Sequence, residues 1–152
     1  MRPNYVLATS SLMLLIPVWA ALKTGDTVRV WYHAGVTVIS ITYHLTKHPV
    51  VFWIDMAAAN SLVPSALTLA HRDYMLFSHL SCLLYCFGMF YYGYIKKDLV
   101  WHPDPIVATR YHVSLHWAAS FGLALAILIT NSALALERSR TPMSRLAVAD
   151  AP

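Results

Sequence analysis

Five residues of the sequence have types and spacings that suit a metal centre. His112 and His116 are four positions apart, and Ser40 and His44 have the same separation. Asp55 follows His44 by eleven positions. Residues four positions apart lie on the same face of a helix. Three imidazoles, a carboxylate and a hydroxyl suit a catalytic zinc site, in which three histidines bind the ion and a fourth position stays open for water.

Each of these residues has a predicted role. His44, His112 and His116 are expected to bind Zn²⁺, which lowers the pKa of water in the open position to about 7. Asp55 is then expected to orient that water or to transfer its proton. Ser40 is expected to stabilise an oxyanion or to hold His44 in place. Two histidines four positions apart are also compatible with simple packing, so the prediction depends on the whole set.

Long apolar segments must position these side chains. The chain has 152 residues, of which 58% are apolar and 12% are charged, whereas globular proteins carry about 25% charged residues. Within the apolar stretches of the five segments given below, Asp55 is the one residue with a formal charge. A helix needs about 17–25 apolar residues to cross the hydrocarbon layer of a membrane. The segments that reach at least this length are residues 5–22, 30–46, 49–70, 74–95 and 106–136.

The sequence therefore predicts an all-α, polytopic transmembrane bundle of about five spanning helices. We expect a single domain over residues 1–152, with a polar tail at residues 137–152. This composition excludes a soluble enzyme, a nucleic-acid-binding domain, a disordered chain and a disulfide scaffold. The protein is expected to be an integral, multi-pass membrane protein. Basic residues divide almost evenly between the two sides, so the orientation and the organelle stay open.

The order of the segments brings the candidate residues together. Short connections make neighbouring segments antiparallel, so His44 near the end of the second lies on the same side as Asp55 in the third. Two further crossings return the chain to that side, where the fifth segment begins close to His112 and His116. All the candidate residues are therefore expected at one depth of one leaflet, whichever way the protein is oriented.

The motif of Ser40, His44, Asp55, His112 and His116 resembles the signature of the CREST superfamily of membrane hydrolases. Within the superfamily, the spacing is most similar to that of the alkaline ceramidases, and the adiponectin-receptor type is more distant. The resemblance implies a zinc ion held by the three histidines in an intramembrane cavity. It also implies that the aspartate and the serine act around the metal in hydrolysis of an amide. The superfamily has seven spans and this chain has room for five.

Two functions follow as expectations. The first is a zinc-dependent intramembrane hydrolase of a lipid amide or ester, which resembles the alkaline ceramidases. The second is a non-catalytic accessory subunit that keeps the CREST-like core inside a multi-subunit membrane complex. The expected partners are accordingly membrane lipids and proteins of a membrane complex, and nucleic acid is not expected.

Two further alternatives remain open at this stage. The first segment is either a retained span or a cleaved signal peptide, since Arg2 precedes an apolar run. A haem site would require axial histidines on facing helices, for which His33 and His79 are the candidates. The closely spaced pair of His112 and His116 is better suited to binding one metal ion than to binding two haems.

Overall fold

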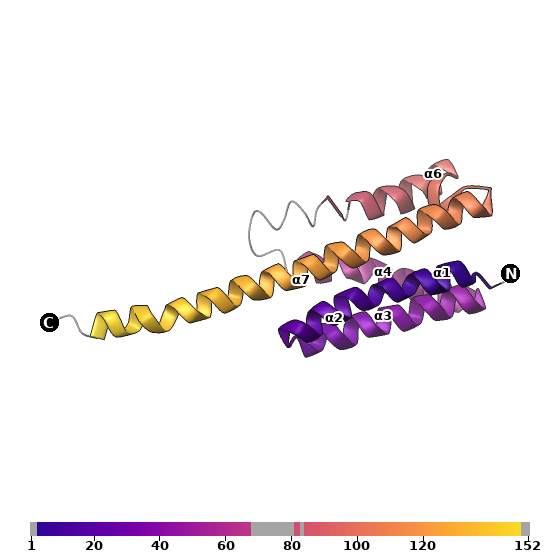
Figure 1. Cartoon of the computed structure of the whole chain (residues 1–152). Helices are drawn as coiled ribbons and strands as arrows, with labels where there is room; N and C mark the ends of the chain where they lie inside the picture. The colour runs from indigo at the N-terminus through magenta and orange to yellow at the C-terminus, as the bar shows by residue number, and fades with distance from the viewer. Residues whose placement is uncertain (1–2, 68–80, 83, 150–152) are drawn as a thin grey trace.

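The computed structural model describes residues 3–67, 81–82 and 84–149, and this part of the chain is helical without a strand (Figure 1). The all-α prediction is therefore confirmed. Residues 81–82 and 84–87 are helical and lead into η2. The named elements are α1 (Tyr5–Ser10), η1 (Ser11–Leu14), α2 (Leu15–Thr24), α3 (Thr27–Thr46), α4 (Pro49–Leu67), η2 (Gly88–Tyr92), α6 (Gly93–Lys96), η3 (Leu99–Trp101) and α7 (Pro105–Ala149).

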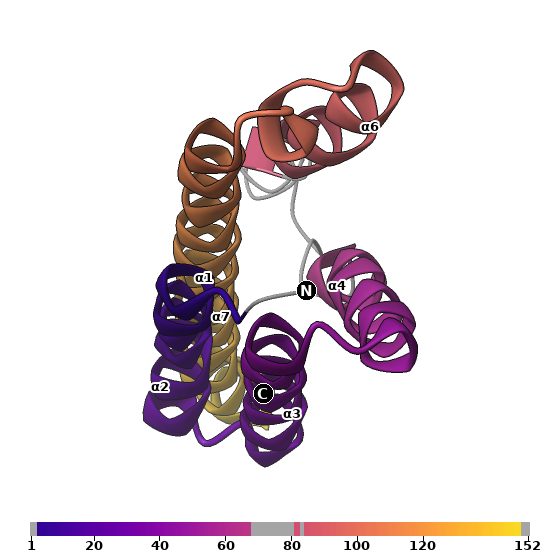
Figure 2. The same cartoon turned by 90° about the vertical axis from the view of Figure 1, so that its right-hand side faces the viewer.

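The first three elements form one continuous helical stretch. The side chain of Asn4 caps its start, where Oδ1 accepts a hydrogen bond of 3.0 Å from the backbone N–H of Leu7. Gly25 ends the stretch with a φ of 72°, a left-handed conformation that glycine adopts without a Cβ penalty. A tight turn follows, so α3 runs back alongside α2 (Figure 2).

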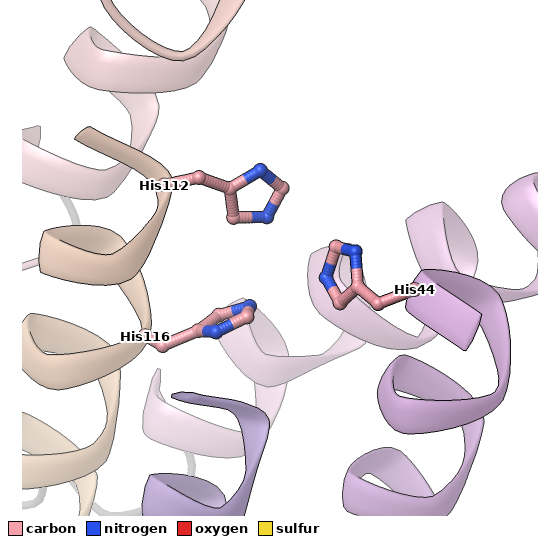
Figure 3. Close-up of side chains that lie close together, drawn as sticks. All are labelled: His44, His112 and His116. Atoms are coloured by element: carbon pink, nitrogen blue, oxygen red, sulfur yellow. The ribbon is translucent and has the colours of Figure 1, made fainter. Parts of the chain in front are cut away.

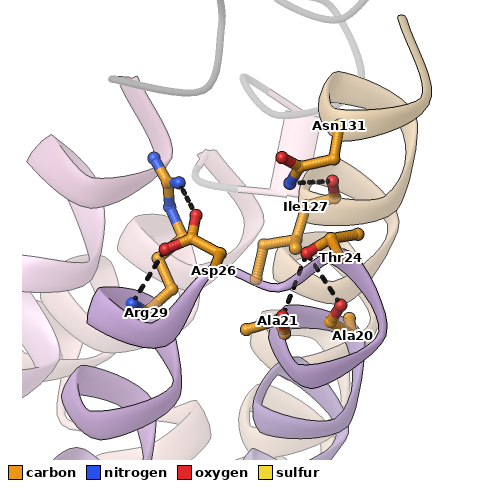
Figure 4. A network of polar contacts seen from close by, with 7 residues as sticks. All are labelled: Ala20, Ala21, Thr24, Asp26, Arg29, Ile127 and Asn131. Carbon is orange, nitrogen blue, oxygen red and sulfur yellow. Dashed lines mark hydrogen bonds and ion pairs between the residues drawn. The ribbon is translucent and has the colours of Figure 1, made fainter. Parts of the chain in front are cut away.

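Polar contacts close this turn (Figure 4). Asp26 caps α3 by accepting from the backbone N–H of Arg29, and it also forms an ion pair with the Arg29 guanidinium. The Thr24 hydroxyl bonds the carbonyls of Ala20 and Ala21 at 3.1 Å each. Caps of this kind satisfy backbone groups that a helix end leaves free.

Small residues let the helices approach each other closely. Ala20 and Ala21 of α2 are fully buried against Ala124, Ala126 and Ile127 of α7. Interfaces between membrane helices are enriched in small residues for this reason. Figure 2 shows α3 between α2 and α4, and of these three helices it is α2 that packs on α7.

The connection from α3 to α4 is very short. Lys47 ends α3 with a φ of 52°, and Pro49 begins α4. Proline suits the first position of a helix because its missing N–H has no partner there. Pro64 lies inside α4.

Two helical segments, Tyr5–Thr24 and Pro105–Glu137, are long and apolar enough to cross a membrane. The expected spans at 30–46 and 49–70 correspond to α3 and to α4, which ends at Leu67. Most of the expected span at 74–95 lies outside the described residues. A bundle of five spans therefore stays a prediction. Helix α7 continues through the expected tail to Ala149 and projects beyond the other helices (Figure 1).

Candidate metal centre

Three histidines from two helices meet in the interior. His44 lies in the last turn of α3, while His112 and His116 lie near the start of α7. Their rings face one another (Figure 3), with centroids 5.0 Å apart for His44 and His112 and 5.5 Å apart for His44 and His116. One ligand nitrogen from each ring lies within 4.8 Å of the others. Two nitrogens on one zinc ion at about 2.0–2.1 Å are at most about 4.2 Å apart, so small ring rotations would close the set around an ion.

The burial of His44 supports a ligand role. Its side chain is fully buried, and its Nε2 atom has no hydrogen-bond partner. A buried polar atom without a partner costs about 1–3 kcal/mol. A cation held between the three rings would satisfy this nitrogen, so the site fits a metal ion.

Ser10 of α1 fixes the tautomer of His116. Its Oγ lies 2.8 Å from His116 Nδ1 and donates its one proton to the carbonyl of Leu7 at 2.9 Å. The serine oxygen must therefore accept the second bond, which places a proton on His116 Nδ1. In a neutral imidazole the other nitrogen then carries a lone pair, so His116 Nε2 is ready to bind a metal.

Lys47 contacts the other side of the cluster. Its Nζ atom lies 3.2 Å from His44 Nδ1. Burial lowers the pKa of this lysine, and the negative charge of Asp55 acts in the opposite direction. An ammonium group only donates, so His44 Nδ1 accepts here. A metal bound at His44 Nε2 would place the ring proton on Nδ1 and release the lysine from this contact.

Asp55 and Ser40 stand beside the histidines. Ser40 is 4% exposed, and its Oγ lies 3.1 Å from Ser11 Oγ. The Asp55 carboxylate on α4 interacts with the Ser40 hydroxyl and with the charge of Lys47. The two candidate catalytic residues therefore contact each other across the helices that carry them.

All five candidate residues line one cavity of about 290 Å³. An apolar cavity of about 110 Å³ adjoins it, between α4, the helix that ends in η2, and α7. The residues that line both are Met56, Ala59, Leu62, Phe90, Leu115 and Ala119. The cavity that holds the five candidate residues thus lies next to an apolar cavity, and the two share part of their lining.

Sequence reasoning missed Ser10 and Ser11 and gave Lys47 no role in the metal site. The serines were visible in the sequence as polar residues that interrupt the apolar run of residues 5–22. This run starts at the end of the bundle where the helix of His44 finishes, and the serines and His44 both lie within two turns of that end. Lys47 was visible as the sole charged residue between α3 and α4. Although it lies in a connection, its side chain lines the cavity.

Among the described residues, the histidines outside this cluster are His33, His48 and His102. His33 is 2% exposed, and its Nε2 has no hydrogen-bond partner. His79, the second candidate for a haem ligand, lies outside the described residues. The haem alternative therefore stays untested.

Comparison with protein-family models, with curated proteins and with solved structures finds no match for the chain. The chemistry of the cavity must therefore be argued from its own residues. What the geometry provides is a triad of histidines that suits a metal ion.

Proposed function

We propose that this chain is a multi-pass membrane hydrolase that holds zinc at His44, His112 and His116 and cleaves a lipid amide or ester, as its resemblance to the CREST superfamily implies. One observation supports this proposal above the others. The three histidines, Asp55 and Ser40 line the same cavity, and that cavity continues into an apolar chamber. The reactive head of a lipid suits the larger cavity, and part of its hydrocarbon tail can enter the apolar one.

Zinc is the metal that this donor set favours. Three neutral imidazoles with an open fourth position form the usual catalytic zinc set. When bound, zinc would polarise a substrate carbonyl and lower the pKa of a water molecule to about 7. The bond from His116 Nδ1 to Ser10 holds that ring in the tautomer that such a site requires.

The remaining polar residues supply proton transfer and orientation. Asp55 is the acidic residue among those lining the cavity, so it is the group that can accept a proton from an entering water. Ser40 can turn its one proton from Ser11 to a developing negative charge on the carbonyl oxygen. Its neighbour Ser11, which bonds the carbonyl of Leu7, holds the Ser40 hydroxyl in place.

The outer surface supports a lipid environment. Trp31 and Trp53 are 74% and 70% exposed, and Val28 is 80% exposed. Soluble monomers rarely expose large apolar patches, and a bilayer would cover these side chains. A lipid substrate then reaches the cavity without passing through water.

The test is hydrolysis by the purified full chain in detergent micelles. We expect cleavage of a fluorescent N-dodecanoyl sphingosine or of p-nitrophenyl palmitate that depends on added Zn²⁺. Asp55→Asn should lower kcat by about 10²–10⁴-fold, the range typical of general acid–base groups, with zinc content unchanged. Asp98→Asn, an exposed cap of η3, serves as the control. Equal rates with and without zinc would contradict the proposal.

One observation favours the accessory subunit as a second candidate. Helix α7 continues to Ala149 and projects beyond the rest of the bundle (Figure 1), where a neighbouring protein can pack on it. Copurification with a large complex, together with bound zinc but no turnover, would favour this function over hydrolysis.

A further inference from the structure

One charged residue of the larger cavity has no opposite charge at ion-pair distance within the part of the chain that the structure describes. Lys47 lines the cavity, and the ion pair found among the described residues joins Arg29 to Asp26 at the other end of α3. Asp55 influences Lys47 through space without forming an ion pair with it. The ammonium is therefore available to an anionic group on a ligand.

The backbone holds this ammonium at the cavity. Lys47 adopts the left-handed conformation that ends α3, and its N–H donates to the carbonyl of Tyr43 at 2.7 Å. Its Nζ atom lies 4.6 Å from the centre of the Tyr43 ring and 3.2 Å from His44 Nδ1. The ammonium thus stands directly behind one of the clustered imidazoles.

Neutral hydrogen-bond donors lie beside it. Asn4 is fixed against the end of α3 by a bond of 2.9 Å from its N–H to the carbonyl of His44. Its Nδ2 donates to Thr109 Oγ1 at 3.2 Å, which leaves the proton of the Thr109 hydroxyl for another acceptor. Asn4, Thr109 and Lys47 all line the cavity. Together they form a set of donors that suits a carboxylate.

The charge balance of the cavity also favours an anion. The charges of Asp55 and Lys47 cancel, and the three imidazoles are neutral when they bind a metal. A bound divalent ion would therefore give the cavity a net positive charge. In that state His44 Nδ1 carries the ring proton and releases the ammonium of Lys47. A negative group on the substrate would then complete the site.

The position of Lys47 limits the length of the head group. Only one imidazole ring separates its ammonium from the centre of the cluster. The anionic group must therefore sit close to the bond that is cleaved. A carboxylate on the carbon next to the amide nitrogen meets this requirement, whereas a long phosphodiester head would extend past the lysine.

We infer that the substrate is an N-acyl amino acid, a lipid amide with a carboxylate head that pairs with Lys47, and this inference rests on the proposed function. The acyl chain extends from the amide towards the apolar chamber. In the reaction, the hydroxyl of water adds to the acyl carbon, the carbon–nitrogen bond breaks, and the nitrogen takes the remaining proton. The products are a fatty acid and a free amino acid.

Equilibrium binding to the zinc-loaded full chain in micelles tests this inference. The probes are N-palmitoylglycine and N-palmitoylethanolamine, which share the tail and the amide but differ in the charge of the head. We expect the glycine conjugate to bind about tenfold more tightly, because a charge-assisted hydrogen bond is worth about one such factor. Lys47→Met should remove this preference, and Lys47→Arg should keep it.

Lys97→Met is the matched control. Lys97 also ends a helix in the left-handed conformation, with its Nζ 4.2 Å from the centre of the Tyr94 ring, but it does not line the cavity. This variant should keep the preference of the wild-type protein. Equal binding of the two probes by the wild type, or an unchanged preference in Lys47→Met, would overturn the inference. Preference without hydrolysis of either probe would contradict the proposed hydrolase and leave the carboxylate site standing.

Discussion

At the scale of the residue, the histidine cluster depends on hydroxyl groups from a third helix. Ser10 holds the ring of His116, and Ser11 holds Ser40, so α1 and η1 together support residues of both α3 and α7. Partners of metal ligands fix ring orientation and raise the basicity of the ligand. Cleavage of the first segment would remove both serines from these contacts.

Ser10→Ala should weaken zinc binding by about 10–100-fold, the range found when such supporting bonds are removed. Its helical content should stay unchanged, since alanine is a good helix former. Zinc titration against a chelating indicator measures the effect. Ser132→Ala is the control, because Ser132 is exposed on α7 and bonds the carbonyl of Leu128 in its own helix. Equal zinc affinity in the wild type and Ser10→Ala would show that the hydroxyl does not support the site.

At the scale of the element, sequence periodicity predicted the helices but not their rotation. The long apolar runs located α1 to α4 and α7, and alternation of direction placed His44, Asp55 and His112 near one another. The contribution of Ser10 and Ser11 was not predictable in the same way. Ser11 begins η1, which has about three residues per turn, so a uniform helical period does not predict where these hydroxyls lie.

Close packing between elements gives a second prediction. A Cβ atom at Gly122 of α7 would lie 2.5 Å from the Sγ of Cys82, at the edge of the apolar chamber. Gly122→Ala should therefore destabilise the protein by about 1–3 kcal/mol, the usual cost of overpacking. Thermal unfolding in detergent measures this change.

Two variants test whether the contact with Cys82 is the cause. Gly35 has no atom within 4 Å of an added Cβ, so Gly35→Ala should stabilise α3 by about 0.5–1 kcal/mol. The double variant Gly122→Ala with Cys82→Ala should recover most of the loss. A Gly122→Ala protein as stable as the wild type would show that α7 and the helix of Cys82 do not pack this closely.

At the scale of the whole molecule, the number of membrane crossings is the main prediction still to be tested. Hydropathy alone identifies Tyr5–Thr24 and Pro105–Glu137 as long and apolar enough to span. Polar residues on the inner face of α3, including His33, Thr37 and His44, reduce its mean hydropathy although they are buried. The extension of α7 to Ala149 was not predicted, because a polar segment without an apolar face gives no packing signal.

Five crossings place the two ends of the chain on opposite sides of the membrane, whereas two crossings place them on the same side. We therefore predict that epitope tags at residues 1 and 152 differ in protease protection in sealed vesicles. A tag in the connection before Thr27 should behave like the tag at residue 152. Protection of both terminal tags, or of neither, would contradict the bundle of five spans.

The metal content of the purified protein tests the central claim most directly. Mass spectrometry of the metals should find one zinc ion per chain in the wild type and none in His112→Ala, with the helical content nearly unchanged. His48→Ala should keep its zinc, because His48 is exposed in the connection to α4. Zinc absent from the wild-type protein after reconstitution, or retained in His112→Ala, would show that the three histidines do not form a zinc site.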